Sequence, residues 1–485
     1  MKKSFTLSLA LLGQMIFAQY ATPNDGKTYR IADLDTLTDV ITFDQTTNRY
    51  ELTDDLTISV NDTFLSDTDY TLVIADGKLI TIAGTIDVNA PKEVLFTSDN
   101  PGTTYFKGIR IEEGATASFN HFKMVYGGGI RSLNESFIMN NSEISYQYGG
   151  ISTGGAINFS RGNPIIKNST FKFNKTPVVG SGANQSVALT FENNHLEGNN
   201  QDNSNRPQIN MGPSGNNPTI IRGNTIIGDR EKTRVGGISV SSLLGVTNEA
   251  IIENNTIRNN RYGITISGGN SKGKIIGNIL EDNNTETNPT NGGSGISIYL
   301  ASNPTTNVID IFDNQIRGSL WGITNIEKGA FINLGTAERP GNNIFSNNGN
   351  GGINYALYNN SVNDVSAVGN CWIENQKSSE QQVENVIVHQ KDDPTLGLVD
   401  YSDFLCSNLA TSEVNSKKFS LYPNPTNGNF TVDTKEKSPY QIFDVNGKLI
   451  HQGELKIGQN SIQTNLPKGV YIFKTNQTSS KIIVK

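Results

Sequence analysis

An irregular repeat in which a glycine is followed by isoleucine and then by alternating residues constrains this chain most strongly. It occurs as Gly237-Ile-Ser-Val-Ser, Gly263-Ile-Thr-Ile-Ser and Gly295-Ile-Ser-Ile-Tyr, with related segments at Gly322 and Gly352. Apolar and polar residues that alternate in this way are typical of a β-strand with one buried face. Because the segments are short and recur along the chain, the repeat predicts a coil of stacked strands.

A second repeated line places an asparagine between two apolar stretches, as in Ile220-Ile-Arg-Gly-Asn-Thr-Ile and Ile251-Ile-Glu-Asn-Asn-Thr-Ile. Asparagine tolerates the left-handed backbone of a sharp bend, and stacked side-chain amides can hydrogen-bond from turn to turn. The line therefore predicts a structural ladder that contains Asn224, Asn255, Asn278 and Asn314. Alignment of the remaining segments adds Asn120, Asn141, Asn168, Asn194, Asn343 and Asn370. Glycine, asparagine and β-branched residues throughout these segments argue against helices.

Together the two lines resemble the right-handed parallel β-helix family over roughly residues 50–406. The resemblance implies an all-β fold, and we expect an N-terminal segment and cap over residues 19–60 and the β-helix with its C-terminal cap over residues 61–406. An apolar share of only 35%, with 48 glycines, suits a coil with a thin core. The family contains lyases, hydrolases and adhesins, so the resemblance does not predict an activity.

The N-terminus has the pattern of a secretory signal peptide over residues 1–18: Met1-Lys2-Lys3, an apolar run from Phe5 to Phe17, then Ala18. The run is shorter than the ~20 apolar residues of a membrane span, and no second long apolar stretch follows. We therefore expect a secreted protein whose mature chain has no transmembrane segment. Export would allow Cys371 and Cys406 to form a disulfide, although two unrelated buried thiols remain the alternative.

The end of the chain differs in composition from the repeat. Residues 407–417 form a Ser/Thr/Asn-rich linker, and residues 418–485 alternate apolar residues between Asn-Gly and Pro-Lys-Gly turns, which predicts a small β-sandwich. The segments Tyr422-Pro-Asn-Pro, Asp444-Val-Asn-Gly and Leu466-Pro-Lys-Gly-Val-Tyr resemble the type A sorting domain of the Bacteroidetes type IX secretion system. This resemblance implies contact with the secretion machinery, an extracellular or cell-surface location, removal of the tail and attachment to surface lipopolysaccharide. A carbohydrate-binding or filler sandwich is the alternative.

Alternation along the glycine-isoleucine strands predicts which side chains face outward. The first outward column contains Arg110, Arg131, Asn158, Asn210, Ser239, Thr265, Ser297, Thr324 and Asn354. The second contains Glu112, Ser160, Ser241, Ser267 and Tyr299. Glu112 is the single carboxylate in these columns, which disfavours a hydrolase that needs paired acids on this face. No cofactor is expected, and calcium at Asp310 and Asp313 has little support.

Two groups of residues are candidates for ligand binding. The first group could bind an acidic sugar or supply a lyase base. The alternative is that its arginines merely pair with Asp229, Glu231 and their neighbours. Its members are Arg206, Arg230, Arg234, Arg261 and Tyr262. The second comprises Tyr299 and Trp321, which could stack on sugar rings or instead fill a wide turn. Tyr355 follows them on the next turn, but alternation predicts that it points inward.

These patterns favour a secreted or surface-attached protein that binds glycans or mediates adhesion without catalysis. The alternative is a lyase or glycoside hydrolase that acts on extracellular polysaccharide. An enzyme should gather ionisable residues in one cleft, and here they are scattered along the sequence. Extracellular polysaccharide and surface lipopolysaccharide are the candidate partners. A net charge of −7 without a basic cluster argues against nucleic acid.

Overall fold

The computed structural model describes residues 19–404, 406, 419–434, 437–444, 447–475 and 479–485. The chain divides into two compact units, Met1–Cys406 and Ser407–Lys485. The predicted signal peptide and the predicted linker lie outside the described residues.

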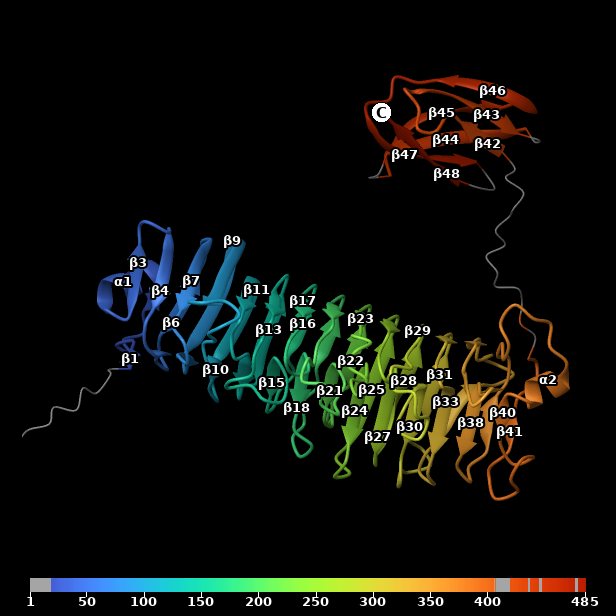
Figure 1. Cartoon of the computed structure of the whole chain (residues 1–485), viewed down its shortest axis with the longest axis horizontal. Coiled ribbons are helices and arrows are strands. Elements are labelled where there is room, and N and C mark those ends of the chain that lie inside the picture. The colour runs from blue at the N-terminus through green and yellow to red at the C-terminus, as the bar shows by residue number, and fades with distance from the viewer. Residues whose placement is uncertain (1–18, 405, 407–418, 435–436, 445–446, 476–478) are drawn as a thin grey trace, which may run out of the picture. The chain divides into compact units, whose positions relative to one another are not determined.

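The first unit is a coil of short parallel strands that stack from one end to the other (Figure 1). One face of the coil is a 14-stranded sheet, here called sheet 1. Its strands, in order, are β1 (Tyr20–Ala21), β5 (Leu56–Ile58), β8 (Leu79–Ile82), β10 (Gly108–Ile111), β12 (Ile130–Ser132), β15 (Ile157–Phe159), β18 (Val179–Ser181), β21 (Ile209–Met211), β24 (Ile238–Ser242), β27 (Ile264–Gly268), β30 (Ser294–Tyr299), β33 (Trp321–Ile326), β38 (Leu357–Asn360) and β40 (Ile387–Val388).

Two further columns of parallel strands complete the coil, and the long strands β9 and β11 belong to both. Sheet 2 contains β2 (Thr28–Tyr29), β6 (Thr63–Ser66), β9 (Thr85–Ser98), β11 (Thr116–Val125), β13 (Ser136–Asn140), β16 (Ile165–Lys167), β19 (Thr190–Glu192), β22 (Thr219–Arg222), β25 (Asn248–Glu253), β28 (Ser271–Ile276), β31 (Ile309–Phe312), β34 (Ile332–Gly335), β39 (Val365–Ala367) and β41 (Val399–Asp400). Sheet 3 contains, besides β9 and β11, β4 (Arg49–Leu52), β7 (Tyr70–Ile74), β14 (Glu143–Ser145), β17 (Thr170–Lys172), β20 (His195–Glu197), β23 (Thr225–Ile227), β26 (Thr256–Arg258), β29 (Ile279–Glu281), β32 (Gln315–Arg317) and β35 (Ile344–Ser346).

Stacked aliphatic side chains set the register of sheet 1. Ile238 pairs with Ile264, Ile264 with Ile296, and Ile296 with Ile323, and all four side chains are fully buried. Each buried isoleucine contributes about 1.5–3 kcal/mol, and a slip of one residue would turn the whole column outward. The predicted parallel β-helix is therefore confirmed, with the glycine-isoleucine segments forming most of sheet 1.

Asparagine side chains form a continuous buried ladder beside the core. It runs through Asn194, Asn224, Asn255, Asn278, Asn314, Asn343 and Asn370, each at most 3% exposed. The backbone N–H and Nδ2 of each member before Asn370 donate to Oδ1 of the next; for example, both groups of Asn255 donate to Asn278, at 3.0 and 2.9 Å. Because every amide has partners on the adjacent turn, the ladder satisfies backbone groups that the bend removes from the sheets.

The inclusion of Asn120, Asn141 and Asn168 in this ladder was wrong. At the turns of Asn141 and Asn168 the ladder position is occupied by serines, since the Ser142 N–H donates to Oγ of Ser169 and the Ser169 N–H donates to Oδ1 of Asn194. At the turn of Asn120 the position is occupied by Phe122, whose N–H donates to Oγ of Ser142. Asn141 and Asn168 are the preceding residues, with φ values of 47° and 51°. The bend is thus made by the residue before the ladder, where a left-handed backbone favours asparagine or glycine.

The segment at Gly352 is a second correction. Residues 349–354 form an exposed hairpin of β36 (Gly349–Asn350) and β37 (Ile353–Asn354), and the strand of sheet 1 begins only at Leu357. Tyr358 therefore pairs with Thr324 in the first outward column, in the place predicted for Asn354. The Gly-Ile pair of this turn forms a hairpin whose isoleucine is exposed.

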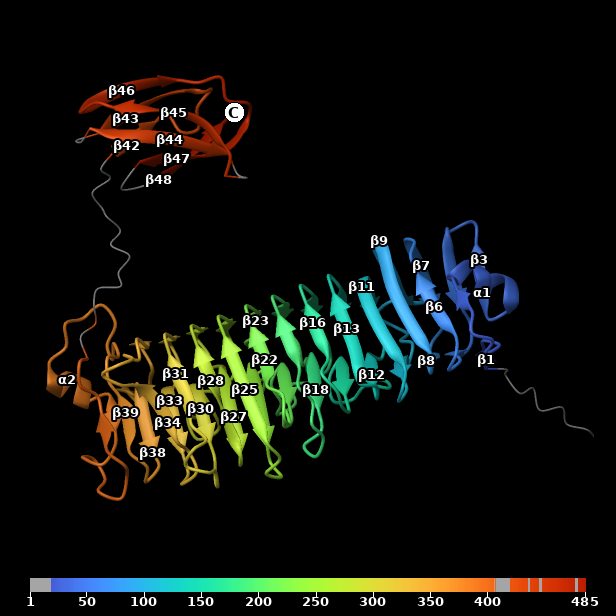
Figure 2. The same ribbon diagram turned by 180° about the vertical axis from the view of Figure 1, so that it is seen from behind.

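Different elements cover the two ends of the coil (Figures 1 and 2). At the N-terminal end lie helix α1 (Ile31–Leu37) and strand β3 (Ile41–Asp44), which pairs with β4 in the antiparallel direction. At the other end lie helix α2 (Glu380–Glu384) and the buried Trp372, whose ring stacks on Phe345 with centroids 5.1 Å apart. The predicted disulfide between Cys371 and Cys406 is present in this C-terminal cap.

The second unit is the predicted small β-sandwich. Its three-stranded antiparallel sheet contains β42 (Phe419–Tyr422), β43 (Asn429–Thr434) and β46 (Gly458–Gln463). Its four-stranded antiparallel sheet contains β45 (Leu449–Leu455), β44 (Ser438–Asp444), β47 (Gly469–Thr475) and β48 (Ser479–Val484). Residues such as Val432, Ile442 and Phe473 form the hydrophobic core of this unit.

Candidate binding groove

A groove of about 420 Å³ lies on the outer face of sheet 1 toward the C-terminal part of the coil. Its floor consists of Thr265, Ser297 and Thr324, which lie in register on β27, β30 and β33. These positions point outward because side chains alternate along a strand and the adjacent isoleucines fill the core. The complete lining is Arg261, Tyr262, Thr265, Pro289, Thr290, Asn291, Gly292, Ser294, Ser297, Trp321, Thr324, Ile326 and Tyr358.

Aromatic side chains line the C-terminal side of this groove. The ring of Trp321 stacks on that of Tyr358, with centroids 5.4 Å apart and an angle of 18° between the planes. Tyr355 also contacts Trp321, at 4.6 Å between centroids, and is half-buried, so the prediction that Tyr355 points inward was wrong. The groove thus combines an aromatic side with a floor of hydroxyl groups.

The segment between β29 and β30 forms one wall of the groove. The indole Nε1 of Trp321 donates to the backbone carbonyl of Pro289 at 3.0 Å. Arg261 donates through Nη2 to the carbonyl of Asn291, two residues further along the same wall. Two lining side chains therefore hold the wall in place from two different turns of the coil.

Tyr262 lies on the N-terminal side of the groove and packs closely against the preceding turn. A Cβ on Gly236 would lie 2.2 Å from Cζ of Tyr262, so only glycine at position 236 leaves room for the ring. Burial raises the pKa of Tyr262 to about 12, and the nearby Arg261 opposes this only in part. The phenol therefore stays protonated at neutral pH and is a hydrogen-bond donor as well as an apolar surface.

The structure brings together three of the predicted binding residues, Arg261, Tyr262 and Trp321. Tyr299 is 46% exposed and pairs in register with Ile326 of the lining, so it stands beside the groove. Tyr358 was missed, because the inserted hairpin displaced its strand from the Gly-Ile pattern that located the others.

The other three candidate arginines lie outside the lining. Arg206 donates to the carbonyl of Thr153, and Arg230 donates to the side chains of Asn259 and Asn284. Arg234 is exposed. Within the described residues none of the four arginines forms an ion pair with Asp229 or Glu231. Arg206, Arg230 and Arg261 instead donate to uncharged neighbouring groups.

The predicted carboxylates of the outer faces are engaged by neighbouring side chains. Glu112, which directly follows β10, accepts from Nε of Arg110 on that strand at 2.6 Å. Asp310 accepts from Asn333 at 3.0 Å, and Asp313 accepts from Asn342 at 3.2 Å. Calcium at Asp310 and Asp313 stays a prediction, and nothing in these contacts favours it.

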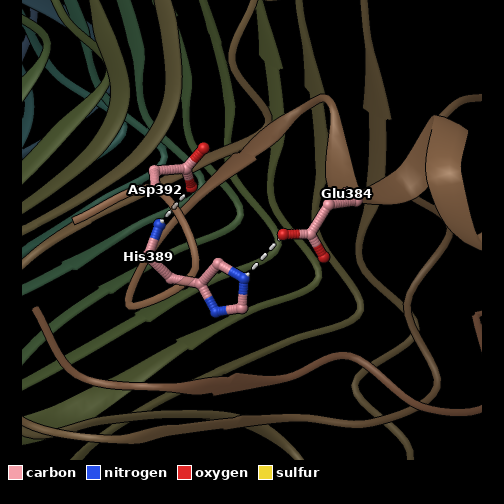
Figure 3. Close-up of side chains that lie close together, drawn as sticks. All are labelled: Glu384, His389 and Asp392. Carbon is pink, nitrogen blue, oxygen red and sulfur yellow. Dashed lines mark hydrogen bonds and ion pairs between the residues drawn. The ribbon is translucent and has the colours of Figure 1, made fainter. Parts of the chain in front are cut away.

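A second group of ionisable side chains, Glu384, His389 and Asp392, lies in the C-terminal cap (Figure 3). Nδ1 of the fully buried His389 accepts from the Val399 N–H at 2.9 Å, so the proton is on Nε2, which donates to Glu384 at 3.0 Å. Asp392 accepts from the backbone N–H of His389 at 3.0 Å. With both ring nitrogens engaged, the histidine has no lone pair left for a metal ion. We therefore interpret the group as a hydrogen-bonded clasp of the cap.

This clasp makes the stability of the cap dependent on pH. Burial would raise the pKa of Glu384, but hydrogen bonds from Tyr401, Lys391 and His389 outweigh it and lower the pKa to about 2. Because the pKa is depressed on folding, the stabilisation is fully present above the pKa of an unfolded glutamate and is lost as the pH falls toward 2.

We therefore expect Glu384→Gln to lower the free energy of unfolding by about 1–3 kcal/mol at neutral pH. The difference from the wild type should shrink between about pH 4.5 and pH 2, as the native carboxylate is protonated. Urea unfolding of both proteins across this pH range measures it. If the difference in unfolding free energy does not change with pH, the charge of the Glu384 carboxylate is not what stabilises the cap.

Comparison with known families identifies the second unit. Residues 420–485 match the model of a family described as a secretion system C-terminal sorting domain. The second unit is a type IX secretion sorting domain. The sorting domain marks proteins that are exported to the cell surface or the extracellular space, so this protein is exported by that route and contacts the secretion machinery. The alternative of a carbohydrate-binding or filler sandwich is thereby set aside.

The coil ahead of the sorting domain matches a second family over residues 208–378, described as a protein of unknown function (DUF1565), which is of the β-helix type. This segment contains every residue that lines the groove. No curated protein and no solved structure gives a significant match to the chain. Among the residues described, none of the helices is long and apolar enough to cross a membrane.

Proposed function

We propose that the coil binds a glycan in the groove of sheet 1 and acts outside the cell as a non-catalytic glycan-binding or adhesive protein. The observation that carries this proposal is the stacked pair Trp321 and Tyr358 beside the hydroxyl floor. Flat aromatic rings match the apolar faces of pyranose rings, and the hydroxyl groups of the floor can exchange hydrogen bonds with those of a sugar. A volume of about 420 Å³ lies within the usual range of ligand sites.

The chemistry of the lining favours binding over hydrolysis. Glycoside hydrolysis needs a pair of carboxyl groups on either side of the scissile bond. The residues that line the groove include no aspartate, glutamate, histidine or lysine. The ligand we favour is extracellular polysaccharide, and surface lipopolysaccharide is the second candidate.

The test measures binding of the purified full-length protein to a panel of neutral and acidic polysaccharides and lipopolysaccharide. We expect Trp321→Ala to weaken binding of any ligand found by about tenfold or more, because a central aromatic contact is lost. Tyr148→Ala removes an aromatic ring that is more exposed than Trp321 (49% exposed) and lies several turns away, and it should leave binding unchanged. Binding that survives the loss of Trp321 would refute the groove as the site.

The same panel separates binding from catalysis. New reducing ends, or ultraviolet absorbance from unsaturated uronates, would be followed over a day with and without calcium. Turnover of any member of the panel would overturn the non-catalytic part of the proposal and favour the lyase or hydrolase alternative.

A further inference from the structure

The N-terminal side of the groove carries a positive charge that no acidic side chain neutralises. Arg261 lines the groove, and within the described residues its guanidinium group forms no ion pair. The chain as a whole has a formal charge of −7, so a groove whose one ionised lining residue is a cation differs from the average surface.

The hydrogen bonds of Arg261 leave part of its capacity unused. Nη1 donates to the side-chain oxygen of Asn205 and Nη2 to the carbonyl of Asn291, and both acceptors are neutral. Within the described residues the buried Nε–H has no acceptor. A Cβ on Gly292 would lie 2.8 Å from this Nε, so glycine at position 292 lets the wall pack closely on the Arg261 side chain. Nη1 and Nη2 each keep a second N–H, and such a pair is suited to bind a carboxylate through two parallel hydrogen bonds.

One loop connects Arg261 with two further arginines that lie outside the groove lining. Asn205, the partner of Arg261, precedes Arg206, and Asn203 in the same loop accepts from the backbone N–H of Arg234. Arg206 and Arg234 are exposed and, within the described part of the chain, unpaired with acids. Their charges add an attractive field for an anion that approaches Arg261.

We propose that the groove selects an acidic saccharide, with a carboxylate of the chain at Arg261 and a sugar ring on Trp321 and Tyr358. This inference rests on the proposed glycan-binding function and adds the class of glycan. The neutral floor between the two ends suits the uncharged hydroxyl groups of the same chain.

The test uses the full-length protein and three acidic polymers: polygalacturonate, alginate and hyaluronate. Each is compared with its carboxyl methyl ester, which keeps the sugar and removes the charge. We expect at least one acid form to bind about tenfold or more tightly than its ester, and we expect this preference to fall as salt is added. Esters that bind as tightly as the acids would overturn the inference and leave the glycan-binding function standing. Binding of no polysaccharide in the panel would refute both.

Three variants locate the charge. Arg261→Gln should weaken the acid form by about tenfold or more and leave the ester within about twofold, whereas Arg230→Gln removes the same charge outside the lining and should change neither. Arg261→Lys keeps the charge and should restore part of the affinity for the acid form. If Arg261→Gln weakens binding of the acid and ester forms equally, Arg261 only holds the wall. If Arg230→Gln weakens binding of the acid form as much as Arg261→Gln does, the location of the charge in the groove does not matter. Either result would overturn the inference.

Discussion

Replacement of Asn278 by leucine is expected to destabilise the coil by about 3–5 kcal/mol, because several buried polar groups lose their partners at once. Oδ1 of Asn278 accepts from the backbone N–H and the Nδ2 of Asn255. Its Nδ2 donates to the carbonyl of Ile252 and to Oδ1 of Asn314. Leucine offers none of these atoms, and the site is fully buried, so water cannot replace them.

Denaturant unfolding followed by circular dichroism measures this loss. Asn254→Gly is the matched control, because Asn254 precedes the ladder residue Asn255, is exposed and has a φ of 55°, which glycine adopts freely. The control should change the free energy of unfolding by less than about 1 kcal/mol. Similar losses for the two variants would show that the turn, and not the ladder, carries the stability.

Removal of the disulfide by the double substitution Cys371→Ser and Cys406→Ser is expected to cost about 3–4 kcal/mol. The bond joins residues 35 apart and closes the C-terminal cap, so its loss enlarges the freedom of the unfolded segment. We expect faster hydrogen exchange first in the cap, around Trp372 and α2, because each turn of a coil contacts only its neighbours.

Unfolding of the wild type with and without reductant provides the control for this variant. The reduced wild type should match the double variant, and the oxidised wild type should be more stable than both. Identical midpoints for all three would contradict a stabilising role for this bond.

The sequence predicted the strands of the coil well because one physical rule governs them. Alternation with a period of two places isoleucine inside and a hydroxyl residue outside, and this located Thr265, Ser297 and Thr324 on one face. The ladder from Asn194 onward followed from repetition, and its hydrogen bonds from turn to turn were predicted, but the left-handed bend was assigned to the wrong residue. The ladder residues supply hydrogen bonds, whereas the left-handed bend belongs to the residue before each of them.

The parts that sequence could not predict depend on the loops. Tyr358 entered the outward column because a hairpin at residues 349–354 delayed its strand, and no local pattern marks such an insertion. The wall at residues 289–292 has no period of its own and is placed by hydrogen bonds from Trp321 and Arg261. Glu384 and His389 of the clasp are likewise brought together by tertiary contacts alone, so the sequence did not predict this pair.

Fluorescence of Trp321 tests the central claim most directly. The chain has two tryptophans, and Trp372 is buried with an Nε1 that has no partner, so Trp372→Phe leaves Trp321 as the single reporter at little cost in hydrogen bonding. Titration of this variant with a bound polysaccharide should shift the emission of Trp321 and protect it from a soluble quencher, with the same midpoint as binding measured by calorimetry. Saturable binding that leaves the emission and quenching of Trp321 unchanged would contradict the groove as the binding site.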